Sequence, residues 1–258
     1  MVKYIKGFFK YRFLLRELVR KGVKLKYRKS YLGIIWSLIE PILTTIVLVL
    51  VFGTLLGHRE KDFSLYIVCG RLLYTFFSSG TKQSMTSIRR NASMIRKVYV
   101  PKYLYPLAEI LFNYIIFFIS LLVLVLVMIY CRTVPTVLIW QVIPALLMVL
   151  LLTIGMGMIL STLHVFFRDT EYLWNVVLML IMYMCAIFYY PNKILESGHA
   201  WLLRYNPLYC IIDIFRGGIM GYMADSWNYI FAGAVSVLSV IIGTYIFWKK
   251  QDEFILHI

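Results

Sequence analysis

Six long apolar stretches alternate with shorter polar segments along the chain. They cover residues 34–56, 63–80, 107–130, 136–163, 173–190 and 227–248. A helix needs about 20 mostly apolar residues to cross the hydrocarbon core of a bilayer. The pattern therefore predicts an all-α polytopic membrane protein with six transmembrane helices.

Residues 1–31 precede the first apolar stretch and predict a basic amphipathic helix. Apolar side chains recur every three or four positions, and another face carries Lys10, Arg16, Arg20 and Lys24. Such a helix lies in the membrane interface, with its charges toward anionic lipid. Binding to calmodulin-type partners or to nucleic acid is a weaker interpretation, because the segment is attached directly to a span.

Residues 82–106 connect the second and third stretches and hold six Lys and Arg residues but no acid. Met85, Ile88, Ala92, Ile95 and Tyr99 follow helical spacing, which predicts a short helix lying across the membrane face. A solvated loop would explain the charge. It would not explain the apolar side chains, which suggest contact with a protein partner.

Residues 191–226 contain two apolar runs that are too short to cross a bilayer, residues 201–203 and 208–215. Asn206 and Pro207 separate these runs and are typical of a turn. Two short re-entrant helices dipping in from the outer side would have this composition, provided that protein surrounds them. An ordinary outer loop with surface helices is the alternative.

The composition agrees with a membrane protein and excludes a disordered chain. Of 258 residues, 61% are hydrophobic and 15% are charged, against about 45–50% and 25% in soluble domains. The mean hydropathy is +0.79. The basic residues are unevenly placed: residues 1–31, 82–106, 164–172 and 249–250 hold 20 of the 27 Lys and Arg residues, and the alternate connections hold six. Because positive charge is retained inside, both termini are predicted to be cytoplasmic.

The six tryptophans fit the same topology, because indole rings gather at headgroup depth. Three fall at predicted cytoplasmic ends (Trp36, Trp174, Trp248) and three at predicted outer ends (Trp140, Trp201, Trp227).

Polar and aromatic residues inside the apolar stretches are candidates for a substrate path. Arg71 interrupts the second stretch, and a cation at that depth must face protein or water. It either contacts an anionic group of a substrate or pairs with an acid such as Asp213. Asp213 and Arg216 are three residues apart and could pair on one helix face. Aromatic faces offer contacts of low specificity, so a second set of path candidates is Tyr66, Tyr74, Phe76 and Phe77.

Several kinds of chemistry are missing from the sequence. There is no phosphate-binding loop, no HExxH and no GxSxG motif. The four histidines are isolated and the four cysteines form no CxxC pair, so no catalytic residue, metal site or bound cofactor is predicted. Gly155 and Gly157 lie inside an apolar stretch and predict close helix packing.

Five segments, in order, resemble the membrane-spanning permeases of type-2 ABC exporters for polysaccharide, O-antigen or teichoic acid (Wzm-like, TarG-like and rhamnan exporters). The most specific is the run from Asn91 to Pro101, followed by Pro106. The others are Tyr31 to Gly33 with Trp36 and Pro41, Phe166 to Asp169, Asn206-Pro207 with Arg216, and the tail from Phe247 to Phe254. The likeness covers essentially the whole chain.

This resemblance implies a homodimer with a channel on its two-fold axis and two copies of an ATPase subunit that bind ATP and Mg. It implies that residues 84–98 form a helix that docks on the ATPase. The implied coupling residues are Ser84, Ile88, Arg89, Arg90, Asn91, Met94, Ile95, Arg96, Lys97, Arg168 and Asp169. It further implies an outer gate with Asn206, Pro207, Asp213 and Arg216.

The sequence thus predicts a non-catalytic permease in the bacterial cytoplasmic membrane that exports a lipid-linked glycan, with membrane lipids and no nucleic acid as partners. A membrane-embedded glycosyl- or acyltransferase would need an array of acids or histidines that is not recognisable here. A secondary transporter is disfavoured because no inverted repeat is evident. A drug-exporting ABC permease is the nearest alternative.

Overall fold

A computed structural model describes residues 11–27, 32–55, 61–97, 100–196 and 198–257. Within these ranges the chain is helical and contains no strand. In chain order the elements are α2 (Arg12–Tyr27), η1 (Gly33–Ile35), α3 (Trp36–Leu55), α4 (Lys61–Arg90), α5 (Ala92–Lys97), α6 (Leu104–Cys131), η2 (Val137–Gln141), α7 (Val142–Phe166), α8 (Thr170–Met184), α9 (Asn192–Leu195), α10 (Trp201–Arg204), α11 (Pro207–Met220), α12 (Ser226–Lys250) and α13 (Phe254–His257). The all-α prediction is confirmed for this part of the chain.

Three helical segments among the described residues are long and apolar enough to cross a membrane: Leu104–Cys131, Val137–Phe166 and Ser226–Lys250. Shorter apolar helices cover Trp36–Val51 and Thr170–Met184. Helix α4 is 30 residues long but carries polar side chains along much of its length. Six spans and the orientation of the termini stay predictions.

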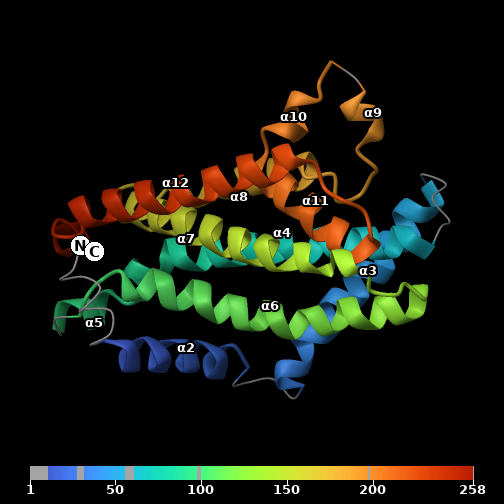
Figure 1. The fold of residues 1–258 in the computed structure, drawn as a ribbon. Coiled ribbons are helices and arrows are strands. Elements are labelled where there is room, and N and C mark those ends of the chain that lie inside the picture. The colour runs from blue at the N-terminus through green and yellow to red at the C-terminus, as the bar shows by residue number, and fades with distance from the viewer. Residues whose placement is uncertain (1–10, 28–31, 56–60, 98–99, 197, 258) are drawn as a thin grey trace.

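The bundle is built on α4, α6, α7 and α12, which run side by side (Figure 1). The α7–α12 contact depends on small residues. A Cβ atom added to Gly155 would lie 2.3 Å from the main-chain carbonyl carbon of Ser239, and one added to Gly243 would lie 2.4 Å from the Gly155 oxygen. A Cβ on Gly157 would lie 2.7 Å from Ser84 Oγ on α4. The predicted role of Gly155 and Gly157 in helix packing is confirmed.

Helix α4 does not end where its apolar stretch ends. It continues to Arg90, so residues 84–90 belong to its last turns, and the prediction of one separate helix over 84–98 is wrong. Tertiary packing extends the helix, because the side chains of Thr81, Ser84 and Ser87 are fully buried on its inner face. Only α5, after a break at Asn91, forms the short helix itself.

Helix α8 stops at Met184, although the apolar stretch continues to residue 190. Other helices satisfy the carbonyls freed by the turn. Asn206 Nδ2 donates to the Met184 oxygen at 3.2 Å, and Tyr66 and Arg216 both donate to the Ala186 oxygen, at 2.8 and 3.1 Å. Ala186 itself adopts a left-handed conformation with φ of 46°.

Helices α2 and α3 both pack against α6 (Figure 1). Helix α2 covers its first half, where Leu15 and Val19 pack with Leu104, Ala108 and Phe112. Part of the apolar face predicted to enter the acyl region therefore packs on protein. Helix α3 begins beside the middle of α6, since Ser120 Oγ donates to the Ser37 oxygen at 3.1 Å.

Two of the tryptophan assignments are corrected by this arrangement. Trp36 starts α3 beside the middle of α6, away from the bundle end where it was expected. Trp174 is buried, and its indole N–H donates to Thr81 Oγ1 at 3.1 Å, so it is a packing residue. The four others are exposed as a headgroup anchor requires: Trp140, Trp201, Trp227 and Trp248.

Candidate functional site

Helix α4 presents a continuous row of polar residues that the rest of the chain leaves uncovered. This polar stripe consists of Arg71, Thr75, Ser79, Lys82, Thr86 and Arg90. Their spacing of three or four residues puts them on one helix face, and none is buried. The stripe is about 29 Å long at 1.5 Å per residue, close to the hydrocarbon thickness of about 30 Å. It carries three cations and no acid.

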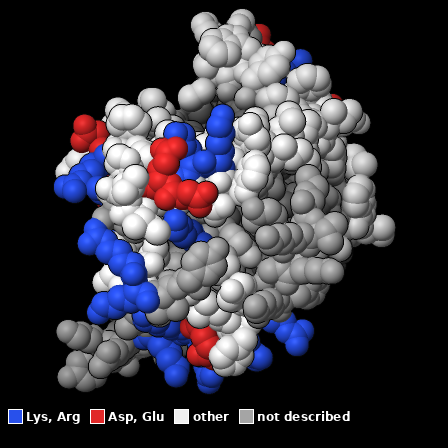
Figure 2. Space-filling model, turned by 90° about the vertical axis from the view of Figure 1, so that its left-hand side faces the viewer, with Lys and Arg blue, Asp and Glu red and all other residues white. Residues whose placement is uncertain are grey.

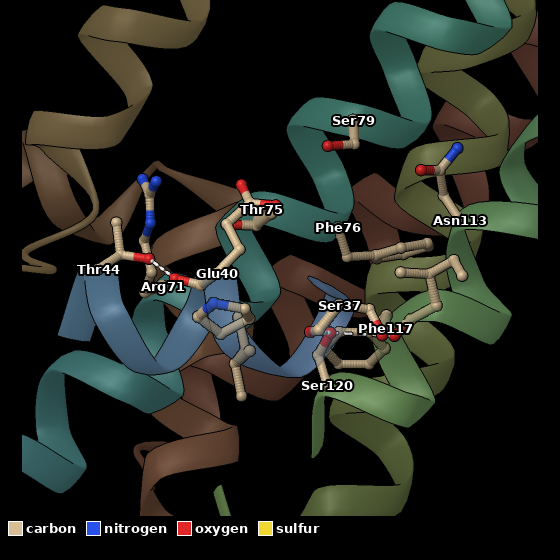
Figure 3. Close-up of a pocket in the computed structure, with 13 residues that line it drawn as sticks. Ser37, Glu40, Thr44, Arg71, Thr75, Phe76, Ser79, Asn113, Phe117 and Ser120 are labelled. Carbon is tan, nitrogen blue, oxygen red and sulfur yellow. Dashed lines mark hydrogen bonds between the residues drawn. The ribbon is translucent and has the colours of Figure 1, made fainter. Parts of the chain in front are cut away.

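A groove of about 140 Å³ lies between α3, α4 and α6 at one part of this stripe. Figure 3 shows its polar lining, with Glu40 on α3, Arg71, Thr75 and Ser79 on α4, and Asn113 on α6. Arg71 Nη1 approaches Met182 Sδ at 3.8 Å. It has no acidic partner within ion-pair distance in the described residues, so its predicted pairing with Asp213 is wrong. A cation in a polar groove is suited to an anionic group that enters from outside the fold.

The four aromatic residues predicted to line a substrate path lie in different surroundings. Phe76 lines the groove and packs on Tyr114 and Phe117, with ring centroids 5.1 and 5.3 Å away. Tyr74 and Phe77 face α8, where Tyr74 donates to the Leu178 oxygen at 2.9 Å. These two side chains are buried, so within one chain they are packing residues and not lining residues.

Tyr66 belongs to a second cavity, of about 340 Å³, at the end of the bundle that carries α9, α10 and α11. Tyr66, Tyr190, Tyr209 and Tyr222 line it together with Asp213. The carboxylate of Asp213 accepts hydrogen bonds from Tyr222 Oη at 2.9 Å and Asn228 Nδ2 at 2.8 Å. Because these groups hold Asp213, the predicted Asp213–Arg216 ion pair is wrong.

Arg216 instead ties three segments together in the interior. Its side chain is 1% exposed, donates to the Tyr66 oxygen at 3.2 Å and to the Ala186 oxygen at 3.1 Å, and lies 3.4 Å from the Tyr66 ring centroid. Gly70 makes room for it, since a Cβ there would lie 2.6 Å from the guanidinium. Arg216 is therefore a structural residue of this end.

Helix α11 has well-defined ends. Asn206 is its N-cap, accepting from the main-chain nitrogens of Leu208 and Tyr209 at 3.1 and 3.3 Å, and Pro207 occupies the first turn. Gly221 ends the helix with φ of 81°. Eleven of its 14 residues are buried, so the helix lies inside the protein.

The other end of the bundle is rich in Lys and Arg, and Figure 2 looks onto it. This basic end includes Arg89, Arg90, Arg96, Lys97, Lys102, Arg168, Lys249 and Lys250. Partial burial and the nearby Arg168 guanidinium lower the pKa of Arg89. The end of α4 and the turn between α7 and α8 therefore meet here, although they are far apart in sequence.

The predicted coupling residues separate by exposure. Those that a partner could touch directly are Arg90, Met94, Arg96, Lys97, Arg168 and Asp169. Arg89 and Asn91 are half-buried. Ser84, Ile88 and Ile95 are buried inside the chain, so they support the surface without forming it. On α2, Arg16, Arg20 and Lys24 are exposed, whereas Lys10 lies outside the described residues.

Two features of the structure were not found from the sequence. Gln141 is fully buried, donates to the Tyr222 oxygen at 3.0 Å and accepts from the Ala224 nitrogen at 3.3 Å. Its place between two apolar runs was the available signal. The other feature is how the tail packs, for which the sequence offered only a family likeness: Phe254 is fully buried and packs on Phe247 with ring centroids 5.1 Å apart.

Comparison with known proteins identifies the family to which this helical chain belongs. The model of the ABC-2 type transporter family matches residues 14–220. The chain belongs to the ABC-2 type transporter family. It is thus a non-catalytic transport permease subunit, and the ATPase of this family is a separate partner subunit.

Curated relatives match over nearly the full length. An O-antigen export system permease protein RfbA from Klebsiella pneumoniae is 27% identical over 246 residues, 93% of each chain. RfbA from Myxococcus xanthus is 27% identical over 260 residues, 98% of each chain. The polysialic acid transport protein KpsM from Escherichia coli is 19% identical over 257 residues, 95% of this chain and 96% of its own.

Proposed function

We propose that the chain is the channel-forming subunit of an ABC transporter that exports a lipid-linked polysaccharide of the O-antigen, capsule, rhamnan or teichoic-acid type across the bacterial cytoplasmic membrane. Two copies form the channel and two ATPase subunits bind at the basic end, which faces the cytoplasm. All six apolar stretches form transmembrane helices, and both termini are cytoplasmic.

The α4 polar stripe carries this proposal. The part of the stripe that lies within the second apolar stretch, from Arg71 to Ser79, is costly if it faces lipid. It is stable against water or against a second copy of the same helix. Two such stripes facing each other across a two-fold axis would line a hydrated path from Arg90 to Arg71.

The chemistry of the stripe and of the relatives supports a glycan with an anionic lipid carrier. Arg71, Lys82 and Arg90 supply positive charge without any competing acid on the stripe. Hydroxyl groups between them offer exchangeable hydrogen bonds to sugar hydroxyls. The relatives named above are O-antigen and polysialic acid transport proteins, which favours a polymer over a drug.

Export in a deletion strain tests this function. In the native host, removal of the gene should abolish surface polymer and leave lipid-linked polymer inside the cells, as measured by immunoblots of intact and lysed cells. The wild-type chain should restore export only with an ATPase partner that hydrolyses ATP. Surface polymer that persists in the deletion strain, together with altered drug resistance, would instead assign the chain to drug export.

A further inference from the structure

We propose that a cavity between α2, α4 and α6 binds the phosphorylated headgroup of a lipid from the membrane leaflet at the basic end. The cavity measures about 610 Å³. Its walls are the middle of α2, the last turns of α4 and the first turns of α6. It is separate from the groove around Arg71, and Arg90 links it to the end of the α4 polar stripe.

The cavity contains two cations that form no ion pair within the described residues, although Arg90 lies near the Glu109 carboxylate. Lys21 from α2 and Arg90 from α4 both line it. Neither forms an ion pair with another described residue. Arg90 spends one donor on Thr86 Oγ1 at 3.2 Å, and its remaining guanidinium donors are available to phosphate oxygens, which a planar fork suits well.

The carboxylate of Glu109 limits which lipid headgroups the cavity could bind. This side chain lines the same cavity, and its carboxylate would repel a simple anion. It is complementary to a phosphate that carries a hydrogen-bond donor next to it. Two membrane sources have this chemistry: the ammonium of an aminophospholipid, and the sugar hydroxyls that follow the diphosphate of a lipid-linked glycan. The second source rests on the function proposed above, and the first does not.

The surroundings favour a lipid over a soluble phosphate compound. The cavity has an apolar wall formed by Leu18, Ala108 and Phe112. Beyond Phe112, α6 continues with exposed Ile115, Phe118 and Leu122 at helical spacing. Acyl or prenyl chains attached to a headgroup in the cavity could lie along this row while the phosphate stays near Lys21 and Arg90.

Lipid retention by the full-length protein tests the proposal. The chain, co-purified with its ATPase partner in nanodiscs of phosphatidylcholine, would be titrated with phosphatidylethanolamine and, separately, with a polyprenyl diphosphate sugar. Bound lipid would be measured by native mass spectrometry. The double variant Lys21→Ala/Arg90→Ala should bind at least one of these probes about tenfold less than wild type.

The matched control is Arg12→Ala/Arg132→Asn, which removes the same charge from exposed positions outside the cavity and should bind as wild type does. Loss of phosphatidylethanolamine alone would assign a structural lipid, and loss of the diphosphate probe would assign an entry site for cargo. Equal binding by cavity and control variants would overturn the site. That result would leave polymer export in the deletion strain, and hence the proposed function, unaffected.

Discussion

Two regions next to helix α4 differ in how their polar side chains are paired: the end of the bundle near α11, and the α4 polar stripe. Near α11, Arg216 and Gln141 are buried and Asp213 is half-buried, and hydrogen bonds within the chain satisfy all three. Along the polar stripe, Arg71 and Lys82 remain accessible and have no ion-pair partner among the described residues. Polar residues in a membrane domain therefore divide into those that hold the fold and those left for water, a partner or cargo.

The largest expected effect lies in the enclosed set. Arg216→Ala would remove one of the donors to each of the Tyr66 and Ala186 carbonyls and open a void beside Gly70. We expect a loss of about 3 to 5 kcal/mol in the free energy of unfolding, which is the range for truncating a large buried side chain to Ala. Denaturation in mixed micelles measures this loss. A variant as stable as wild type would show that the enclosed set does not hold the fold.

The contact of α7 with α12 is expected to be next in size. Gly155→Val would force the helices apart, since its Cβ meets main-chain atoms of Ser239, and overpacking costs about 1–3 kcal/mol. Gly233→Ala is the matched control, because its Cβ would lie 3.5 Å from the flexible end of Met148. Thermal unfolding should separate the two variants, and equal midpoints would contradict the assigned contact.

The stripe should affect transport and not stability. Thr75→Trp would fill the groove, and export of polymer should fall about tenfold or more while the free energy of unfolding changes within about 0.5 kcal/mol. Leu126→Trp places the same ring on the exposed face of α6 and should export normally. Quantified surface polymer in the complemented deletion strain decides between them; equal export by both would remove Thr75 from the path.

A smaller transport effect is expected from the charge on the stripe. Arg71→Gln removes a cation whose polar contact in the described part of the chain is the Met182 thioether, so export should fall several-fold with little change in stability. Arg71→Lys should recover part of the activity, since it restores the charge without the planar fork. Unfolding of the Gln variant at a lower temperature would instead reveal a structural role.

The smallest effect concerns the exposed pair on α2. Glu17 and Arg20 lie 3.8 Å apart with side chains 46% and 66% exposed. Glu17→Ala should change the free energy of unfolding by less than about 0.5 kcal/mol, because exposed ion pairs contribute little. A calorimetric scan at low and high salt checks this, and a large salt-dependent loss would mean that α2 is held by charge instead of by Leu15 and Val19.

The sequence was sufficient for features with strong local signals. Apolar length predicted the long helices, Asn206 with Pro207 marked the start of α11, and Gly155 with Gly157 marked a close contact. The family likeness, carried by motifs such as the run from Asn91 to Pro101, agrees with the family match.

Features that depend on tertiary contacts could not be obtained in this way. Hydropathy ended the second apolar stretch at residue 80, whereas burial of Thr81, Ser84 and Ser87 carries α4 on to Arg90. The partners of Arg216 are main-chain carbonyls, which no residue type reveals, so charge spacing suggested Asp213 instead. Aromatic identity likewise could not separate Phe76 in the groove from Tyr74 in the core.

The central claim is that the α4 polar stripe lines a hydrated path. Its most direct test is the accessibility of α4 to an aqueous thiol reagent in the assembled transporter. Single cysteines would be introduced at each position from 71 to 90, with the native Cys131 replaced, and labelled in membranes with an impermeant thiol reagent. The account predicts labelling at positions 71, 75, 79, 82, 86 and 90, protection by bound polymer, and no labelling at 73, 77 or 84. Uniform protection of the stripe, or labelling without helical periodicity, would contradict it.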